Sequence, residues 1–293
     1  MMSNKFVHII NPVKVNPSSD LHAAQPFTFE SLRKAKEFAK EEIDVALITA
    51  QYPEDHEIIP DFFIRSIDLN RSVLNFGEFE HERKLPLIQD ILERAYKYSK
   101  KGEYLIYTNV DISVMPFFYN YILSKIKNGS DSLIINRRVI KHGTDLTQMC
   151  ADIGKSHPGF DCFVFRRELL DNFELGHACI GANWIGRVMI SNLIMFSNKL
   201  EIIKDAHLTF HIGDDGAWLK KKYTEFDLHN KNEAYQIINS FIKTTKDEKK
   251  KSEFREIIQF MDNWGINELH KNVKDGKWSL KKKIKFKLRQ YLS

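Results

Sequence analysis

Two oxygen-bearing side chains, Asn109 and Asp111, stand two residues apart at the end of an apolar segment. The preceding residues, 104–107, are apolar or aromatic and predict a short buried strand. A pair spaced in this way brings both oxygens to one edge of a sheet. Hard divalent cations such as Mn²⁺ or Mg²⁺ prefer oxygen ligands of this kind and leave positions for phosphate. The same spacing also fits a plain turn closed by an Asx side chain.

A carboxylate between aromatic residues is the second candidate. Asp161 follows Phe160 and opens an apolar stretch that ends at Phe165. Burial beside aromatic rings raises the pKa of a carboxyl group, which suits a general base for a hydroxyl. The alternatives are that Asp161 accepts a hydrogen bond from a ligand hydroxyl, or that it simply begins a strand.

Basic residues supply candidate phosphate contacts. Arg137 and Arg138 follow a predicted strand, and Arg83 with Lys84 precedes a predicted helix. Guanidinium groups clamp phosphate well, although the same residues also occur in solvated turns. Asp90 on that helix is placed to reach a ribose or base, or is an ordinary surface acid.

The elements around these residues alternate between strand and helix. Apolar stretches of strand length predict strands at 6–13, 44–50, 62–69, 104–107, 132–136, 161–165 and 202–212. Amphipathic spacing predicts helices at 31–42, 85–98, 116–126, 185–196, 233–243 and 252–264. This order predicts an α/β fold with a mixed, mainly parallel sheet flanked by helices. Ligands of such sheets bind beyond the carboxyl ends of the strands, where Asn109 and Asp111 fall.

The composition is that of a globular protein, and its charge is uneven. Of 293 residues, 43% are hydrophobic and 28% charged, which argues against overall disorder. The composition changes near residue 216, so we expect an α/β domain at 1–216 and a helical extension at 217–293. The extension ends in a basic, amphipathic segment, residues 278–292, suited to an anionic membrane surface or to packing on the domain. We expect no nucleic-acid partner, because no recognition motif accompanies these cations.

Several enzyme classes are disfavoured by missing motifs. The sequence contains no Walker loop, no GxGxxG and no GxSxG, which argues against P-loop NTPases, dinucleotide dehydrogenases and α/β-hydrolases. Its three cysteines form no CxxC pair, which argues against a disulfide framework or a thiolate zinc site. The first residues carry neither a signal-peptide core nor a cleavage site, so we expect a cytoplasmic protein.

The strand-end motif resembles that of GT-A glycosyltransferases, the nucleotide-diphosphosugar transferase superfamily. In that family the strand ends in Asp-x-Asp, and here it reads Asn109-Val110-Asp111. Residues 24–32 and 85–92 also resemble family segments, and the likeness spans roughly residues 5–215. The Asn in first position weakens the expected metal binding. The acid pair that usually precedes the late helix is missing from residues 180–184, so the sequence does not decide between inversion and retention.

The resemblance implies roles for particular residues. Asn109, Asp111 and His211, a late histidine beside Gly213, would hold Mn²⁺ or Mg²⁺; a loop-bonded His211 is the alternative. Asp161 and Asp111 would be catalytic. The residues expected to contact the nucleotide sugar are Gln25, Arg83, Asp90, Asn109, Asp111, Arg137, Asn183 and Trp184.

The expected function is transfer of a sugar from a nucleotide-diphosphosugar donor to a glycan or lipid-linked acceptor. A sugar nucleotidyltransferase is the first alternative, but it usually carries a glycine-rich loop where this chain has Asn11-Pro12-Val13-Lys14. A non-catalytic nucleotide-sugar or glycan-binding module of the same fold is the second. It is favoured by Asn109 and by the missing acid pair.

Overall fold

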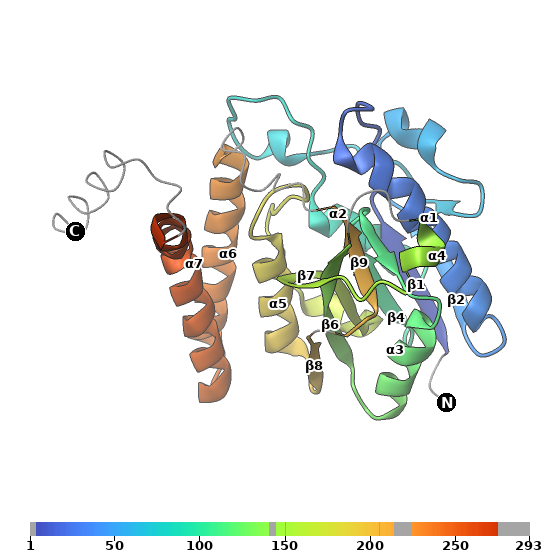
Figure 1. Ribbon diagram of the computed structural model, residues 1–293. Helices are drawn as coiled ribbons and strands as arrows, with labels where there is room; N and C mark the ends of the chain where they lie inside the picture. The colour runs from blue at the N-terminus through green and yellow to red at the C-terminus, as the bar shows by residue number, and fades with distance from the viewer. Residues whose placement is uncertain (1–3, 141–144, 150, 205, 214–223, 275–293) are drawn as a thin grey trace, which may run out of the picture. The chain divides into compact units, whose positions relative to one another are not determined.

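The computed structural model describes residues 4–140, 145–149, 151–204, 206–213 and 224–274 (Figure 1). The strands are β1 (Lys5–Ile10), β2 (Asp44–Thr49), β3 (Ile64–Arg65), β4 (Tyr104–Thr108), β5 (Ile112–Val114), β6 (Ser132–Ile140), β7 (Lys155–Arg166), β8 (Leu200–Ile203) and β9 (Thr209–Ile212). The α-helices are α1 (Asp20–Ala39), α2 (Ile88–Lys97), α3 (Phe118–Lys127), α4 (Leu146–Met149), α5 (Ile185–Phe196), α6 (Thr224–Thr244) and α7 (Glu248–Lys274). Short 3-10 helices are η1 (Pro53–Ile58), η2 (Val73–Asn75) and η3 (Arg167–Asn172).

Within these residues the strands form one mixed sheet. Its order is β3-β2-β1-β4-β7-β6-β9-β5, with β8 paired to β6. Parallel pairs join β1 to β2 and β4, β2 to β3, and β6 to β8 and β9. Strand β7 runs antiparallel to both β4 and β6, and β5 runs antiparallel to β9. The prediction of a mixed, mainly parallel sheet flanked by helices is therefore confirmed.

Strand β7 runs antiparallel to its neighbours β4 and β6, and the described part of the connection from β6 contains no long helix. The only helix described between β6 and β7 is the four-residue α4. A parallel crossover normally uses a long helix to carry the chain back along the sheet. The reversal places the amino end of β7 beside the carboxyl end of β4, and this arrangement builds the site described below.

Helices cover both faces of the sheet (Figure 1). On one face, α1 and α3 pack against alternate residues of the strands, among them Phe6 and Ile10 of β1. On the other face, α2 contacts β1 and β4, and α5 contacts β7. The central strands β1 and β4 are buried on both sides, which explains why they read as continuous apolar runs.

Several elements differ from their predicted bounds. Helix α1 begins at Asp20 and contains Pro26, where the sequence predicted a start at Ser31. Burial of Ala24 and Phe29 in this part of the helix offsets the hydrogen bond that Pro26 cannot donate. The stretch 62–69 forms only the two-residue strand β3, because it lies at the edge of the sheet.

The predicted strand at 202–212 is two strands. Strand β8 pairs with the first half of β6, and β9 pairs with its last residues. His207 lies between them, and its Nε2 is 2.9 Å from the carbonyl oxygen of Asp152. The prediction of a single strand at 202–212 was therefore wrong.

The chain divides into two compact units, Met1–Ile237 and Ile238–Ser293. The division falls inside α6 rather than near residue 216, because the first turns of α6 bond to loops of the first unit. In the second unit Phe241 and Phe254 pack with ring centroids 5.6 Å apart. The basic segment 278–292 lies outside the described residues.

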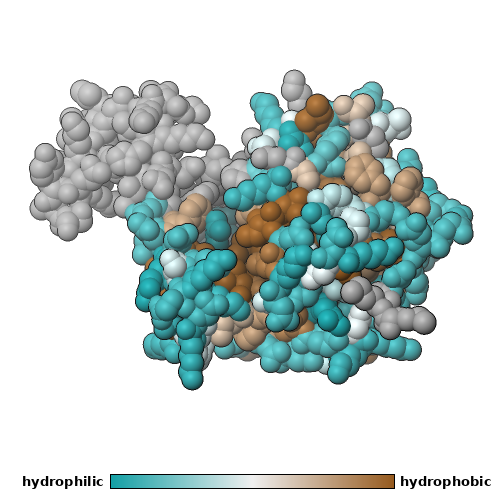
Figure 2. All heavy atoms as spheres, turned by 90° about the horizontal axis from the view of Figure 1, so that it is seen from below, coloured by the Kyte–Doolittle hydropathy of each residue, from teal (hydrophilic) through white to brown (hydrophobic). Residues whose placement is uncertain are grey.

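The surface of the described residues is mostly polar. On the face shown in Figure 2, hydrophilic residues predominate and hydrophobic ones gather near the middle. The most exposed large hydrophobic side chains, Ile67, Ile153 and Phe38, come from separate parts of the chain. None of the helices described here has an apolar run long enough to cross a lipid bilayer.

Candidate active site

One edge of the sheet gathers the polar residues that the sequence singled out. The carboxyl ends of β4, β6 and β9 meet there with the amino end of β7. Four side chains come together at this edge: Asp111, Arg137, Asp161 and His211. We call them the edge cluster. The sequence predicted every one of them as a site residue, although they lie up to a hundred residues apart.

The side chain of Asn109 is a bridge inside the turn after β4. Its Oδ1 accepts a hydrogen bond from the hydroxyl of Tyr107 at 2.8 Å. Its Nδ2 donates to Oδ1 of Asp161 at 3.0 Å, and its backbone N–H donates to the Asp161 carbonyl at 3.3 Å. An Asp at this position would have no proton to donate and would bring a second negative charge to Asp161. The contacts thus give a physical reason for Asn in place of Asp.

Asp161 reaches this position through a β-bulge. Ile135 of β6 pairs with Cys162, and the next β6 residue, Asn136, pairs with Phe160, so β6 has no residue opposite Asp161. Bulges of this kind redirect one side chain and are common beside active sites. The Asp161 carboxylate accepts a hydrogen bond from Nη1 of Arg137 at 3.0 Å.

Asp111 and His211 form the second half of the edge cluster. Pairing of Ile112 with His211 between β5 and β9 brings the two side chains together. Nε2 of His211 lies 3.2 Å from Oδ2 of Asp111. Nδ1 of His211 donates to the carbonyl of Gly213 at 2.7 Å, which fixes the ring orientation. The other carboxylate oxygen of Asp111 is buried without a protein hydrogen-bond partner.

The cluster shifts the pKa values of its members in different directions. Burial raises the pKa of Asp161; Arg137 opposes this and Asp111 adds to it, so the net pKa is raised. Burial also acts to raise the pKa of Asp111, but the hydrogen bond and charge of His211 outweigh it, and that pKa is lowered. Burial acts to lower the pKa of His211, yet Asp111 outweighs it, so the His211 pKa is raised. Two carboxyl groups in one cluster therefore differ in acidity, as acid–base sites require.

The residues at Asp111 fit a hard divalent cation with few protein ligands. Among the described residues, no group of three or more His, Cys, Asp or Glu side chains is placed to share a metal. Mg²⁺, however, is commonly held by one or two carboxylates plus substrate phosphates and water. The buried, unpartnered oxygen of Asp111 meets that lower requirement. The Asn109 amide is already engaged on both sides, so its role as a metal ligand stays a prediction.

Three residues that were predicted to contact the donor bind other groups of the protein. Gln25 is buried, and its amide pairs with the backbone N–H and carbonyl of Val13, at 2.9 and 2.8 Å. Asp90 is clamped by the guanidinium of Arg71, whose Nε lies 2.8 Å from one carboxylate oxygen. Arg83 lies over the ring of Phe226 at 5.9 Å. Contacts of these three residues with a nucleotide sugar stay predictions.

Asn183 and Trp184 lie just before α5, at its amino end. The Asn183 side chain donates to Asp227 of α6 at 2.8 Å. Trp184 is partly buried, and Nζ of Lys231 lies 5.5 Å from the centroid of its ring. Both residues therefore contact α6, an element that sequence reasoning assigned to a separate extension.

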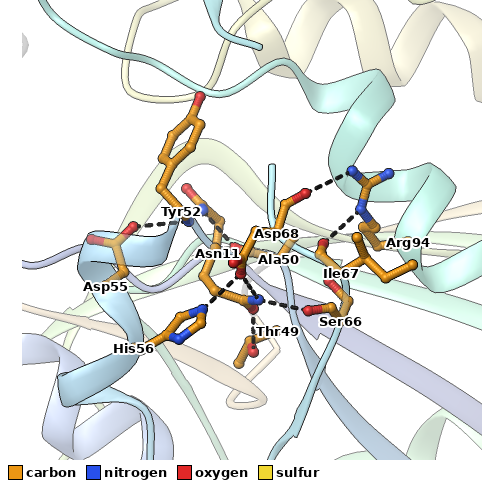
Figure 3. A network of polar contacts seen from close by, with 11 residues as sticks. Asn11, Thr49, Ala50, Tyr52, Asp55, His56, Ser66, Ile67, Asp68 and Arg94 are labelled. Carbon is orange, nitrogen blue, oxygen red and sulfur yellow. Dashed lines mark hydrogen bonds and ion pairs between the residues drawn. The ribbon is translucent and has the colours of Figure 1, made fainter. Parts of the chain in front are cut away.

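A network of polar groups at the carboxyl end of β2 escaped sequence analysis (Figure 3). Gln51 is fully buried, and its Nε2 donates to the Ser66 carbonyl at 2.7 Å and to Oδ1 of Asp68 at 2.9 Å. Nε2 of His56 lies 2.7 Å from the same oxygen. Burial acts to raise the pKa of Asp68, but these hydrogen bonds outweigh it and the pKa is lowered.

The missed residues had a weak signal. Gln51 directly follows a predicted strand, which is where ligands of parallel sheets gather. Asp68 lies in a stretch that was predicted as a strand, so its place in a loop was hidden. Arg94 of α2 fixes that loop by donating to the carbonyls of Ile67 and Asp68, at 2.9 and 3.1 Å.

Comparison with known proteins identifies solved structures with a similar fold. No protein-family model and no curated protein sequence matches the chain. Among solved structures, the chain is similar to S. aureus TarS residues 1–349 in complex with UDP-GlcNAc, with 14% identity and a TM-score of 0.54 over 95% of this chain and 77% of that one. The same protein in complex with UDP gives 12% identity and a TM-score of 0.54 over 96% and 78% of the two chains. These likenesses confirm the GT-A-like fold that the sequence resemblance predicted.

Proposed function

We propose that the protein is a glycosyltransferase that moves a sugar from a nucleotide-diphosphosugar to a glycan or lipid-linked acceptor. The observation that carries the proposal is the edge cluster, in which two carboxylates, an arginine and a histidine meet at the ligand-binding edge of a GT-A-like sheet. The similarity to TarS bound to UDP-GlcNAc supports the same donor class.

Asp111 and His211 would hold Mn²⁺ or Mg²⁺ on the donor diphosphate. A cation there offsets the charge of the diphosphate and stabilises the departing nucleotide. The buried oxygen of Asp111 supports this role, because a buried carboxylate oxygen without a partner costs free energy unless a ligand satisfies it. Arg137 brings a second positive charge to the same edge.

Asp161 would orient the transferred sugar. Its carboxylate is held by Asn109 on one oxygen and by Arg137 on the other. Each oxygen keeps a further lone pair that can accept a hydrogen bond from a sugar hydroxyl. Its raised pKa also suits removal of a proton from an acceptor hydroxyl.

The nucleotide would extend from the edge cluster toward the carboxyl end of β2. The Asp68 carboxylate and the polar network around Gln51 supply acceptors for the N–H groups of a base. Two parts of the proposal rest on the sequence alone. One is the glycan or lipid-linked acceptor. The other is a cytoplasmic location at a membrane surface, which residues 278–292 would contact.

A non-catalytic binding module of the same fold is the second candidate. It is favoured by the Asn109 amide, which bonds within the protein on both sides instead of facing a ligand. Such a module would bind a nucleotide sugar without releasing the nucleotide, so measuring nucleotide release separates the two candidates.

The test is thermal unfolding with UDP-GlcNAc, with and without Mn²⁺. A ligand at a hundred times its Kd stabilises the native state by about 2.7 kcal/mol. We expect Mn²⁺ to enlarge the shift in the wild type and Asp111→Ala to abolish that metal-dependent part. Asp61→Ala, an exposed acid away from the cluster, is the control and should behave as wild type. An unchanged shift in Asp111→Ala would remove Asp111 from the metal site.

A further inference from the structure

Trp184 has a strained backbone. Its φ is 75° and its ψ is −10°, and it is the one non-glycine residue with positive φ in the part of the chain that the structure describes. This left-handed conformation is strained for a bulky residue and persists only where the surroundings impose it. A glycine would adopt it without strain.

The surroundings that impose the conformation come from α6. Asp227 accepts two hydrogen bonds from Asn183, one from its backbone N–H at 2.7 Å and one from its side chain at 2.8 Å. The fully buried Asn230 donates to the Asn183 carbonyl at 2.9 Å and to the Cys179 carbonyl at 2.8 Å. The residue before Trp184 is thus held at its N–H, its carbonyl and its side chain.

The same segment lies against the middle of β7. A Cβ built on Gly186, in the first turn of α5, would lie 3.6 Å from the carbonyl oxygen of Phe160. Phe160 immediately precedes Asp161. Gly186 thus lies beside the residue that precedes Asp161, the carboxylate that we assign to the transferred sugar. Trp184 is two residues before Gly186.

We propose that Trp184 is the surface on which the sugar ring of the donor stacks, and that Asp227 and Asn230 are positioning residues that hold it there. The inference rests on the proposed function. A pyranose presents a face of C–H groups, which the negative face of an aromatic ring attracts, and hydroxyls at its rim, which a carboxylate binds. Trp184 and Asp161 supply these two complementary elements.

The donor sugar is isolated by comparing two probes. Calorimetry gives the Kd of UDP and of UDP-GlcNAc for each variant, and their ratio reports the contribution of the sugar ring. We expect Trp184→Gly, which relieves the backbone strain while removing the ring, to weaken UDP-GlcNAc binding about fivefold and to leave UDP binding unchanged. Tyr235→Ala is the control: Lys231 lies over this ring too, at 5.6 Å, and the ratio should stay at the wild-type value.

The positioning role is tested by exchanging the hydrogen-bonding groups. Asp227→Asn alone keeps one of the two bonds from Asn183, and should lower the UDP-GlcNAc to UDP preference. The double variant Asn183→Asp with Asp227→Asn restores the side-chain bond with its donor and acceptor exchanged, while the backbone N–H of residue 183 still donates to the amide oxygen at 227, and it should recover the preference. A merely structural role of Asp227 would move the melting temperature without changing this ratio.

The outcomes separate the two proposals. A wild type that binds neither UDP nor UDP-GlcNAc would overturn both. A wild type that prefers UDP-GlcNAc, together with a Trp184→Gly variant that keeps the full preference, would overturn the stacking role alone. Failure of the double variant to recover the preference lost in Asp227→Asn would overturn the positioning role.

Discussion

Acidification should destabilise the protein through His8, a fully buried residue of β1. Its Nδ1 lies 2.8 Å from the hydroxyl of Tyr119 and its Nε2 lies 3.0 Å from that of Thr108. Burial lowers the pKa of His8 from 6.5 to about 3, because no carboxylate compensates the desolvated imidazolium. Thr108 directly precedes Asn109, so protonation of His8 also disturbs the base of the turn that carries Asp111.

The magnitude follows from linkage. Between the two pKa values the unfolded chain binds a proton that the folded chain does not, so stability falls as the pH drops below 6.5 and levels off near 3. At pH 5 the loss relative to neutral pH is about 2 kcal/mol, and at the plateau it is about 5 kcal/mol. Above pH 6.5 this contribution is constant.

Urea unfolding at pH 7.5 and pH 5.0 measures the effect, with His8→Gln as the matched variant. Glutamine keeps hydrogen-bonding groups for Thr108 and Tyr119 but does not titrate. We expect the wild type to lose about 2 kcal/mol more than His8→Gln between the two pH values. Equal losses in both proteins would refute the reasoning, because the acid sensitivity would then belong to other groups.

Two further changes test the scaffold by urea unfolding. Gly176 has φ +52°, and an added Cβ would lie 2.0 Å from Oε2 of Glu233, which accepts a bond from the His177 N–H. Gly176→Ala should therefore lower the free energy of unfolding by about 1 kcal/mol more than Gly102→Ala does. At Gly102, φ is +88° and no atom lies within 4 Å of the added carbon. Equal losses in the two variants would contradict this. Arg71→Ala leaves the buried carboxylate of Asp90 without its partner and should lower the free energy of unfolding by about 2–3 kcal/mol. Adding Asp90→Asn to that variant should recover part of the lost stability. A loss under about 0.5 kcal/mol in Arg71→Ala would show that solvent screens the pair.

The sequence was sufficient for the fold class and for the members of the edge cluster. Strands such as β1 and β4 are short, apolar and buried on both faces, so their pattern survives in the sequence. Asp111 follows an apolar run and Asp161 opens one, so both positions stand out in the sequence. Those signals are local, and local signals are what a single sequence carries.

Contacts between distant residues could not be foreseen. Asp90 is paired with Arg71, nineteen positions earlier, and its contact with a nucleotide stays a prediction. The amide of Gln25 bonds to the backbone of Val13, and its contact with the donor stays a prediction. Asp227 was placed in a separate extension, although it fixes the segment before α5. In each case the partner is chosen by tertiary packing, which no periodicity reveals.

The bulge at Asp161 makes the length of β7 a strict requirement. Cys162 faces the core and pairs with Thr108, while the neighbouring Asp161 faces the cluster. Removing or adding a single residue between Asp161 and Arg166 would exchange these two orientations, burying a carboxylate and presenting a thiol. Variation in chain length that keeps Asp161 facing the cluster should thus fall before the bulge rather than between Asp161 and Arg166.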